Sequence, residues 1–163
     1  MSEKVTLLVY DITMGMAKGM SMMLIGQQID LVYHTSLMVY GREYFFGGGI
    51  CNMHPKSTPY GKPVEEIHIG ETEIPREVFE DYLKDLDHKY TPDKYDLINH
   101  NCNMFTAEAA EFLTGNPLDK KYAGQAKELL DSPAGQMFKP FLMQMQQGIQ
   151  NPPPGMYQWF RQA

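Results

Sequence analysis

The chain has 163 residues, of which 43% are hydrophobic and 21% charged, as expected of one globular domain with its own core. Its formal net charge of −6 and the lack of a Lys/Arg run argue against a nucleic-acid surface, because phosphate contacts need clustered basic residues. No apolar run approaches the length of a membrane span, and the first residues lack the layout of a signal peptide. Two cysteines do not make a disulfide scaffold, so we expect a reducing compartment.

The first part of the chain predicts strands on either side of a short helical segment. Residues 5–12 form an apolar run rich in β-formers and predict a buried strand. Residues 14–28 combine five methionines with three glycines and predict one or two short helices. Residues 31–46 contain two β-rich runs around Gly41-Arg42, where a glycine in the first central position favours a type II′ hairpin turn.

The predicted hairpin places His34 and Ser36 on one face of its first strand. With a two-residue loop, Tyr40 opposes Glu43, and counting back sets Ser36 near Gly47 and His34 near Gly49. Glycines at such positions mark either a bulge or a place where another backbone approaches closely. Both interpretations remain open at the level of the sequence.

The rest of the chain predicts one more strand and several helices. Residues 51–63 contain three prolines and predict a loop, and the alternation in residues 65–69 predicts a strand. Helices are expected at 75–87, around 124–130, and from Ser132-Pro133 onward, where Pro140 bends or restarts the last one. We expect one domain over residues 1–147, followed by a flexible proline-rich tail at 148–163 that contains Trp159-Phe160.

Residues 95–115 predict a helix that begins beside a cysteine. Its apolar residues share one side, and they are Phe105, Ala109, Phe112 and Leu113. Asn101 suits the N-cap and Gly115 the left-handed C-terminal cap. Cys102 then lies in the first turn, at the positive end of the helix dipole, where a thiol loses its proton more easily. The alternative is that Cys102 is a small buried hydrophobe.

A cysteine nucleophile needs a neighbouring base, and histidine serves best near neutral pH. His34 opens a strand of the hairpin, and a strand beside a helix N-terminus lets a ring nitrogen face a thiol. The other histidines are less suited by position: His100 is expected to point elsewhere, His54 and His88 lie in predicted loops, and His68 lies in an exposed strand.

The segments HTSLMVYGREYFFGGGI, INHNCNMF, LTG and GETEIPREVFEDYL together resemble the PPPDE superfamily of permuted papain-fold peptidases, specifically its DeSI-type desumoylating isopeptidases. The resemblance covers roughly residues 5–145. It implies an α+β papain-like fold, with a small antiparallel sheet packed against helices, and a dyad of Cys102 as nucleophile and His34 as general base and acid. It also implies cleavage of the isopeptide bond between a ubiquitin-like modifier, SUMO or ubiquitin, and a lysine, in cytoplasm and nucleus. The resemblance implies a homodimer, and it implies no cofactor or metal.

An oxyanion hole is also required, and the backbone N–H of Cys102 is the natural first donor. The side chains of Asn101 and Asn103 are candidates for a second donor or for orienting the histidine. Gly47, Gly48 and Gly49 are candidate substrate-binding residues, since a modifier ending in Gly-Gly could lie extended against a backbone without side chains.

Three other functions are consistent with the sequence. The same dyad could cleave an S-acyl (palmitoyl) thioester, which an apolar groove lined by the methionine-rich segment would favour. The domain could instead bind a modifier without catalysis. A zinc site could use Cys51, His54, His100 and Cys102, although the two-residue spacing of the last pair is cramped.

Overall fold

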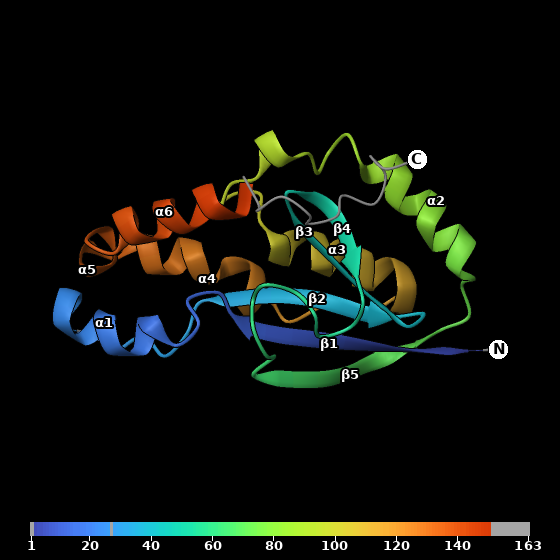
Figure 1. The fold of residues 1–163 in the computed structure, drawn as a ribbon, viewed down its shortest axis with the longest axis horizontal. Helices are drawn as coiled ribbons and strands as arrows, with labels where there is room; N and C mark the ends of the chain where they lie inside the picture. The colour runs from blue at the N-terminus through green and yellow to red at the C-terminus, as the bar shows by residue number, and fades with distance from the viewer. Residues whose placement is uncertain (1, 27, 151–163) are drawn as a thin grey trace.

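The computed structural model describes residues 2–26 and 28–150, which fold as an α+β domain (Figure 1). These residues form one antiparallel sheet in the order β4-β3-β2-β1-β5, with β1 (Glu3–Asp11), β2 (Tyr33–Val39), β3 (Arg42–Gly47), β4 (Gly49–Met53) and β5 (Glu65–Thr72). The helices are α1 (Met16–Ile25), α2 (Arg76–Leu86), α3 (Cys102–Thr114), α4 (Lys120–Asp131), α5 (Pro133–Gln136) and α6 (Lys139–Gln150), with a 3-10 turn at Pro92–Lys94. The predicted fold class, a small antiparallel sheet packed against helices, is confirmed.

Helix α3 packs against the sheet and forms the centre of the core. Its residues Phe105, Ala109 and Leu113 are buried, and they share one hydrophobic cluster with Leu7 of β1 and Leu37 of β2. Burying a side chain of the size of Phe or Leu contributes roughly 1.5–3 kcal/mol relative to leaving it in water. The one-sided apolar spacing therefore predicted this packing face correctly, and it holds α3 in a fixed position on the sheet.

The hairpin of β2 and β3 differs from the prediction in its turn and its register. Val39 pairs with Arg42, so Tyr40 and Gly41 are the two central residues, with φ of 54° and 72°. Two positive φ angles define a type I′ turn, and the predicted type II′ turn at Gly41-Arg42 is wrong. The prediction paired Tyr40 with Glu43, whereas the structure pairs Val39 with Arg42. Each residue of β2 therefore lies opposite a residue two positions earlier in the chain than predicted. The hydroxyl of Tyr40 donates to the carbonyl of Ile74, which holds this residue in its uncommon conformation.

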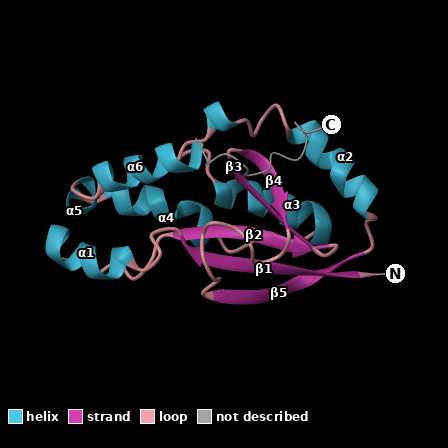
Figure 2. Cartoon of the chain, viewed as in Figure 1, coloured by secondary structure: helices cyan, strands magenta, loops and turns pink. Residues whose placement is uncertain are grey.

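A fourth strand lies where the sequence predicted the start of a loop. β4 pairs with β3 through Phe45 and Cys51 and through Gly47 and Gly49, so Gly48 is the tip of a very tight connection. Gly49 has a φ of 96°, a conformation that favours glycine. β2 and β3 pair at only three positions, and Figure 2 shows β3 and β4 rising steeply away from the other three strands. The sheet therefore splays beside the first half of β2, which has no pairing with β3.

The C-terminal helices agree with the predicted breaks, with one extension. α5 ends at Gln136 and α6 begins at Lys139, so Pro140 lies in the first turn of a restarted helix, as predicted. α6 continues to Gln150, past the predicted domain boundary at residue 147, and Ile149 is buried in the core cluster. Residues 151–163, including Trp159-Phe160, lie outside the described residues.

The methionine-rich segment forms one helix, α1, at the end of the molecule away from α2 (Figure 1). Of its own residues, Ala17 and Ser21 are buried, whereas Met16, Met22 and Met23 are exposed. Of the helices that the structure describes, none combines the length and the apolar character that a membrane span requires.

Candidate active site

The N-terminus of α3 is fixed by Asn101, which caps it as predicted. The side-chain oxygen of Asn101 accepts hydrogen bonds from the backbone N–H groups of Asn103 at 3.0 Å and Met104 at 3.1 Å. Its amide nitrogen donates to the carbonyl of Leu97 at 2.9 Å. Cys102 is therefore the first residue of the helix, where backbone N–H groups lack partners within the helix.

A second asparagine fastens this helix end to β2. The Asn103 oxygen accepts from the Thr35 hydroxyl at 2.7 Å, and its amide nitrogen donates to the carbonyls of Tyr33 and Tyr122, both at 3.0 Å. These contacts join residues far apart in the chain and place the Cys102 thiol beside the backbone N–H of Thr35. Thr35 follows His34, so the structure brings both members of the expected dyad to the same stretch of β2.

His34 lies in a closed aromatic box, with no exposed surface. Its ring stacks on Tyr60 with centroids 3.7 Å apart, and Phe45 and Tyr10 flank it at 5.9 and 5.7 Å. Among the described residues, neither ring nitrogen of His34 has a hydrogen-bond partner. The thiol of Cys102, 1% exposed, instead contacts the Tyr95 hydroxyl at 3.5 Å and the Asn103 oxygen at 3.8 Å. The two residues are therefore near one another but are not hydrogen-bonded.

Burial keeps both groups neutral in this conformation. It raises the pKa of Cys102 to about 11, against the opposing effect of the Tyr95 hydroxyl and of the N–H groups of Thr35, Asn103 and Cys102 itself. It lowers the pKa of His34 to about 3. At pH 7 such a thiol is ionised in about one molecule in ten thousand. The expectation that the helix N-terminus would make this thiol more acidic is wrong for the closed site, because desolvation outweighs the dipole.

The site is closed by the connection between β4 and β5, residues 54–64, which we call the covering loop. Tyr60 from this loop lies over His34. Burial raises the pKa of Tyr60 well above its ordinary value, and the nearby Cys102 and Cys51 raise this pKa further. A Cβ on Gly47 would come 3.0 Å from the Tyr60 hydroxyl and 3.5 Å from Ile149. In this conformation the missing side chain of Gly47 therefore makes room for Tyr60.

Glu43 of β3 anchors the covering loop, and sequence reasoning missed it. This fully buried carboxylate accepts hydrogen bonds from the hydroxyls of Tyr10 at 2.7 Å and Ser36 at 2.5 Å, and from the backbone N–H of Lys56 at 2.8 Å. The signal in the sequence was an acidic residue inside the otherwise aromatic run EYFF. Almost no carboxylate is fully buried without such partners, so this residue marks a structured polar centre next to His34.

The remaining candidates have other contacts. The amide nitrogens of Asn101 and Asn103 donate to backbone carbonyls, so in this conformation the two side chains act as a helix cap and a brace. His100 bonds the Lys89 carbonyl at 2.7 Å, and Cys51 donates to the Gly49 carbonyl at 3.4 Å. In the described part of the chain, no three His, Cys, Asp or Glu residues gather as metal ligands would.

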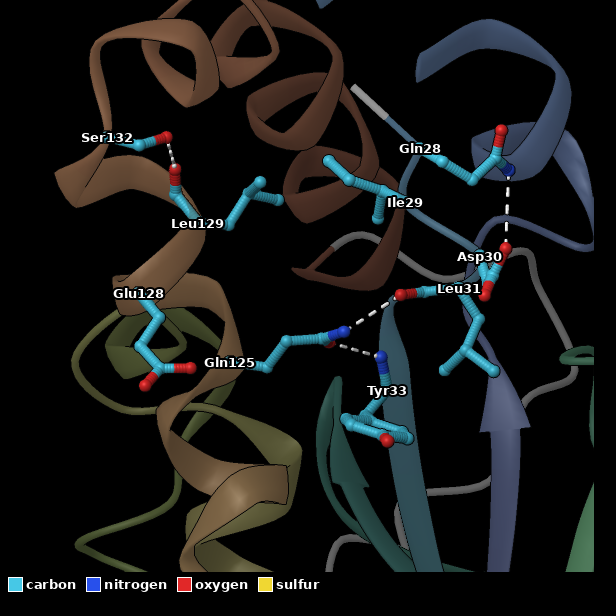
Figure 3. Close-up of a pocket in the computed structure, with 9 residues that line it drawn as sticks. All are labelled: Gln28, Ile29, Asp30, Leu31, Tyr33, Gln125, Glu128, Leu129 and Ser132. Carbon is cyan, nitrogen blue, oxygen red and sulfur yellow. Dashed lines mark hydrogen bonds between the residues drawn. The ribbon is translucent and has the colours of Figure 1, made fainter. Parts of the chain in front are cut away.

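A cavity of about 500 Å³ opens between α4 and the segment leading into β2 (Figure 3). Gln125 crosses it, accepting from the Tyr33 N–H at 2.8 Å and donating to the Leu31 carbonyl at 2.8 Å. Its described lining includes Tyr33 but not His34 or Cys102, and it includes no methionine. This cavity is therefore separate from the closed site and is not the methionine-lined groove that a thioesterase would favour.

The chain is similar to known proteins over most of its length. The family model described as "PPPDE putative peptidase domain" matches residues 3–143. The chain is 38% identical over 153 residues to proteins named Desumoylating isopeptidase 1 from Homo sapiens and Rattus norvegicus, covering 93% of this chain and 89% of each relative. The Xenopus laevis protein of that name is 36% identical over 144 residues, covering 87% of this chain and 85% of the relative. From the extent of these matches, the chain belongs to the PPPDE peptidase domain family and is a cysteine peptidase.

Proposed function

We propose that the chain is an isopeptidase that releases a ubiquitin-like modifier, SUMO in the first place, from lysine side chains, with Cys102 as nucleophile and His34 as base and acid. The observation that carries the proposal is the meeting of two distant segments: the first residue of α3 lies beside β2 at the residue following His34. The names of the relatives support the choice of SUMO.

In the proposed first step, the thiol proton of Cys102 passes to His34 and the sulfur attacks the carbonyl carbon of the modifier's terminal glycine. The negative charge that develops on the carbonyl oxygen is stabilised by the backbone N–H of Cys102. His34 then gives its proton to the departing lysine nitrogen, which leaves a thioester on Cys102. Water, deprotonated by His34, attacks this thioester and releases the modifier's carboxylate and the thiol.

The first step requires Tyr60 to leave His34, because the closed site holds both dyad residues neutral and apart. Opening admits water and the substrate and returns the pKa values of Cys102 and His34 toward their ordinary ranges. In those ranges, transfer of the proton from thiol to imidazole requires little free energy. The extended end of the modifier would then take the place of Tyr60 beside Gly47. The conformational step would thereby couple catalysis to the presence of substrate.

The test is a pair of probes, SUMO and ubiquitin, each carrying a C-terminal electrophile, together with SUMO–lysine and ubiquitin–lysine conjugates as substrates. The SUMO probe should label Cys102, and the full chain should cleave the SUMO conjugate. Cys102→Ala and His34→Ala should each abolish turnover, and the double variant should be no worse than either, because the two residues act as one unit.

Cys51→Ala is the matched control, since Cys51 is also a buried cysteine outside any disulfide and lies close to Tyr60. It should leave labelling and turnover unchanged. Reaction with the ubiquitin probe alone would contradict the choice of modifier. Failure of both probes to label a thiol that small alkylating reagents still modify would contradict the isopeptidase function.

A further inference from the structure

The thiol of Cys102 has a close hydroxyl neighbour that the proposed dyad does not use. Tyr95 donates a hydrogen bond to the sulfur at 3.5 Å, and the bond is buried. The Tyr95 ring is 2% exposed and packs on Phe46 with centroids 5.0 Å apart. A buried tyrosine normally uses its hydroxyl for structure, bonding a carbonyl or carboxylate. Here the partner is the expected nucleophile.

The position of Tyr95 is fixed by the same segment that caps α3. Its backbone N–H bonds the Pro92 carbonyl at 3.3 Å, which ends the 3-10 turn. The next residue, Asp96, exchanges two backbone hydrogen bonds with His100, at 3.0 and 2.9 Å, closing a short loop directly before Asn101. The hydroxyl and the helix N-terminus are therefore set by one compact unit, and the covering loop is not part of it.

We propose that Tyr95 is a further catalytic residue, whose hydroxyl stabilises the Cys102 thiolate when this ion forms and again when the thioester is cleaved. This inference rests on the proposed function for its role in turnover, though not for its effect on the thiol. In the first step the Cys102 proton moves to His34, and the charge left on sulfur is shared with the Tyr95 O–H. In the last step the sulfur leaves as a thiolate, and the same O–H receives it. Tyr95 keeps its own proton throughout.

The chemistry of the site suits a donor that does not ionise. Burial, and then the nearby Cys102, raise the pKa of Tyr95 well above its ordinary value, so the phenol remains protonated and can only offer its hydrogen to sulfur. Of the contacts that lower the pKa of Cys102 against burial, the Tyr95 hydrogen bond has the largest effect. The contact of Tyr95 is with the sulfur itself, whereas an oxyanion-hole donor acts on the carbonyl oxygen.

The test compares Tyr95→Phe with Tyr90→Phe. Tyr90 is the matched control, because it is also 2% exposed and packs on Phe46 at 5.0 Å, while its hydroxyl bonds Glu108 at 2.5 Å instead of the thiol. The rate of iodoacetamide labelling of Cys102 is measured against pH for both variants, alongside Tm. Tyr95→Phe should shift the profile to higher pH and slow labelling at pH 7 by roughly tenfold, since a hydrogen bond to a charged group is lost.

Tyr90→Phe should leave the profile in place even if it lowers Tm. Incorporation of 3-fluorotyrosine at position 95, which keeps the donor, should restore the profile. If Tyr95→Phe and Tyr90→Phe change Tm alike and neither moves the profile, Tyr95 has a structural role only and the inference is overturned. Labelling needs no modifier, so a shifted profile supports the inference even where the SUMO and ubiquitin probes fail. Conversely, if the labelling profile of Tyr95→Phe does not move while the SUMO or ubiquitin probe labels Cys102, the inference about Tyr95 is overturned and the proposed isopeptidase function stands.

Discussion

His34 is unusual among buried residues because its two ring nitrogens have no hydrogen-bond partners within the described structure. A buried polar group left without a partner costs about 1–3 kcal/mol relative to one that is satisfied. The closed box of Tyr10, Phe45 and Tyr60 therefore stores an unfavourable contribution at the residue proposed for proton transfer. A water or a substrate atom that reached the ring would relieve it, which lowers the free energy needed to open the site.

The lowered pKa of His34 makes the stability of the fold depend on pH. The folded state releases this proton at about 3 and the unfolded state at 6.5, so between these values the unfolded chain binds more protons and stability falls as pH falls. From pH 6.5 to 5 this group alone should lower the free energy of unfolding by roughly 2 kcal/mol. Thermal unfolding of the wild type and of His34→Phe should therefore diverge on acidification.

His68 provides the control, because it lies exposed on β5. His68→Gln should follow the wild type, with the same loss of Tm toward pH 5, whereas His34→Phe should lose less. Parallel curves for the wild type and His34→Phe would show that the ring of His34 is solvated in solution and that the box is open.

Two of the three candidate substrate-binding glycines now call for different experiments. Gly49 has a φ of 96°, so a larger residue there costs about 1–2 kcal/mol whether or not substrate passes it. Gly47 has no such strain, and a Cβ on it would meet the Tyr60 hydroxyl at 3.0 Å. Gly47→Ala should therefore displace Tyr60 at a small cost in stability and speed the alkylation of Cys102.

The double variant Gly47→Ala/Tyr60→Ala separates packing from a substrate channel. Once Tyr60 is removed, the added methyl group has no hydroxyl to displace. If Gly47 lies against the modifier's C-terminal residues, cleavage of the SUMO conjugate should be slower in the double variant than in Tyr60→Ala, while alkylation by small reagents is equal in both. Equal cleavage would show that Gly47 serves only to accommodate Tyr60.

At the level of elements, the covering loop supplies Tyr60, the ring that stacks over His34 in the closed site. Its contacts with the body include the Lys56 N–H bonded to Glu43 and an ion pair of Lys56 with Glu66 at 2.8 Å, whose side chains are both about half exposed. Exposed pairs of this kind contribute only about 0–1 kcal/mol. Its other attachments are the Glu43 contact, the Val64 N–H bonded to the Val9 carbonyl at 2.7 Å, and the stacking of Tyr60 on His34. Of these, the stacking on His34 is the contact that a bound peptide could replace.

Tyr60→Ala should raise the rate of Cys102 alkylation at neutral pH, because it removes the ring that covers the site and lets water reach the thiol. Tyr60→Phe keeps the stacking and should behave as the wild type. The measurement is the rate of loss of free Cys102, followed by peptide mass spectrometry so that Cys51 is counted separately. An unchanged rate in Tyr60→Ala would mean that another element closes the site.

The sequence was sufficient for elements whose signals are local. Asn101, the apolar face of α3 and Gly115 lie within one helix, and each was predicted correctly. The turn at Tyr40-Gly41 was not, because a non-glycine residue at positive φ depends on the contact of its hydroxyl with Ile74, 34 residues away. β4 was missed because its pairing with β3, rather than any β-rich pattern in its own residues, defines it.

For the site, the sequence and the family resemblance predicted Cys102 and His34 as the dyad, which stays a prediction, but neither of them predicted the environment of these residues. The neutral state of His34 results from its burial among Tyr60, Phe45 and Tyr10, which come from three different segments. Glu43 and Tyr95 were missed for the same reason, since each acts through a contact with a residue on another element. Long-range burial, which no local pattern records, determined the ionisation state.

At the scale of the whole molecule, the splayed sheet is what allows a helix end to reach the middle strand. β3 leaves β2 after three residue pairs, and α3 contacts both strands beside the gap. The hydroxyl of Thr35 and the side chain of Asn103, 68 residues apart in the chain, lock this arrangement. The proposed dyad therefore depends on the complete fold, so a fragment that lacked either β2 or α3 would lack the candidate site.

The sealed thiol has a consequence for redox chemistry. Peroxide oxidises thiolates and leaves thiols nearly untouched, so a cysteine held protonated and 1% exposed is protected in the resting molecule. In the proposed mechanism, each turnover opens the site and creates the vulnerable ion. We expect hydrogen peroxide to inactivate the resting protein slowly and to inactivate it markedly faster while a SUMO conjugate is being processed. Residual activity and sulfenic-acid trapping at Cys102, compared with and without substrate, measure this, and equal rates would contradict it. Closure of the covering loop would then act as an antioxidant device, restricting damage to the working molecules.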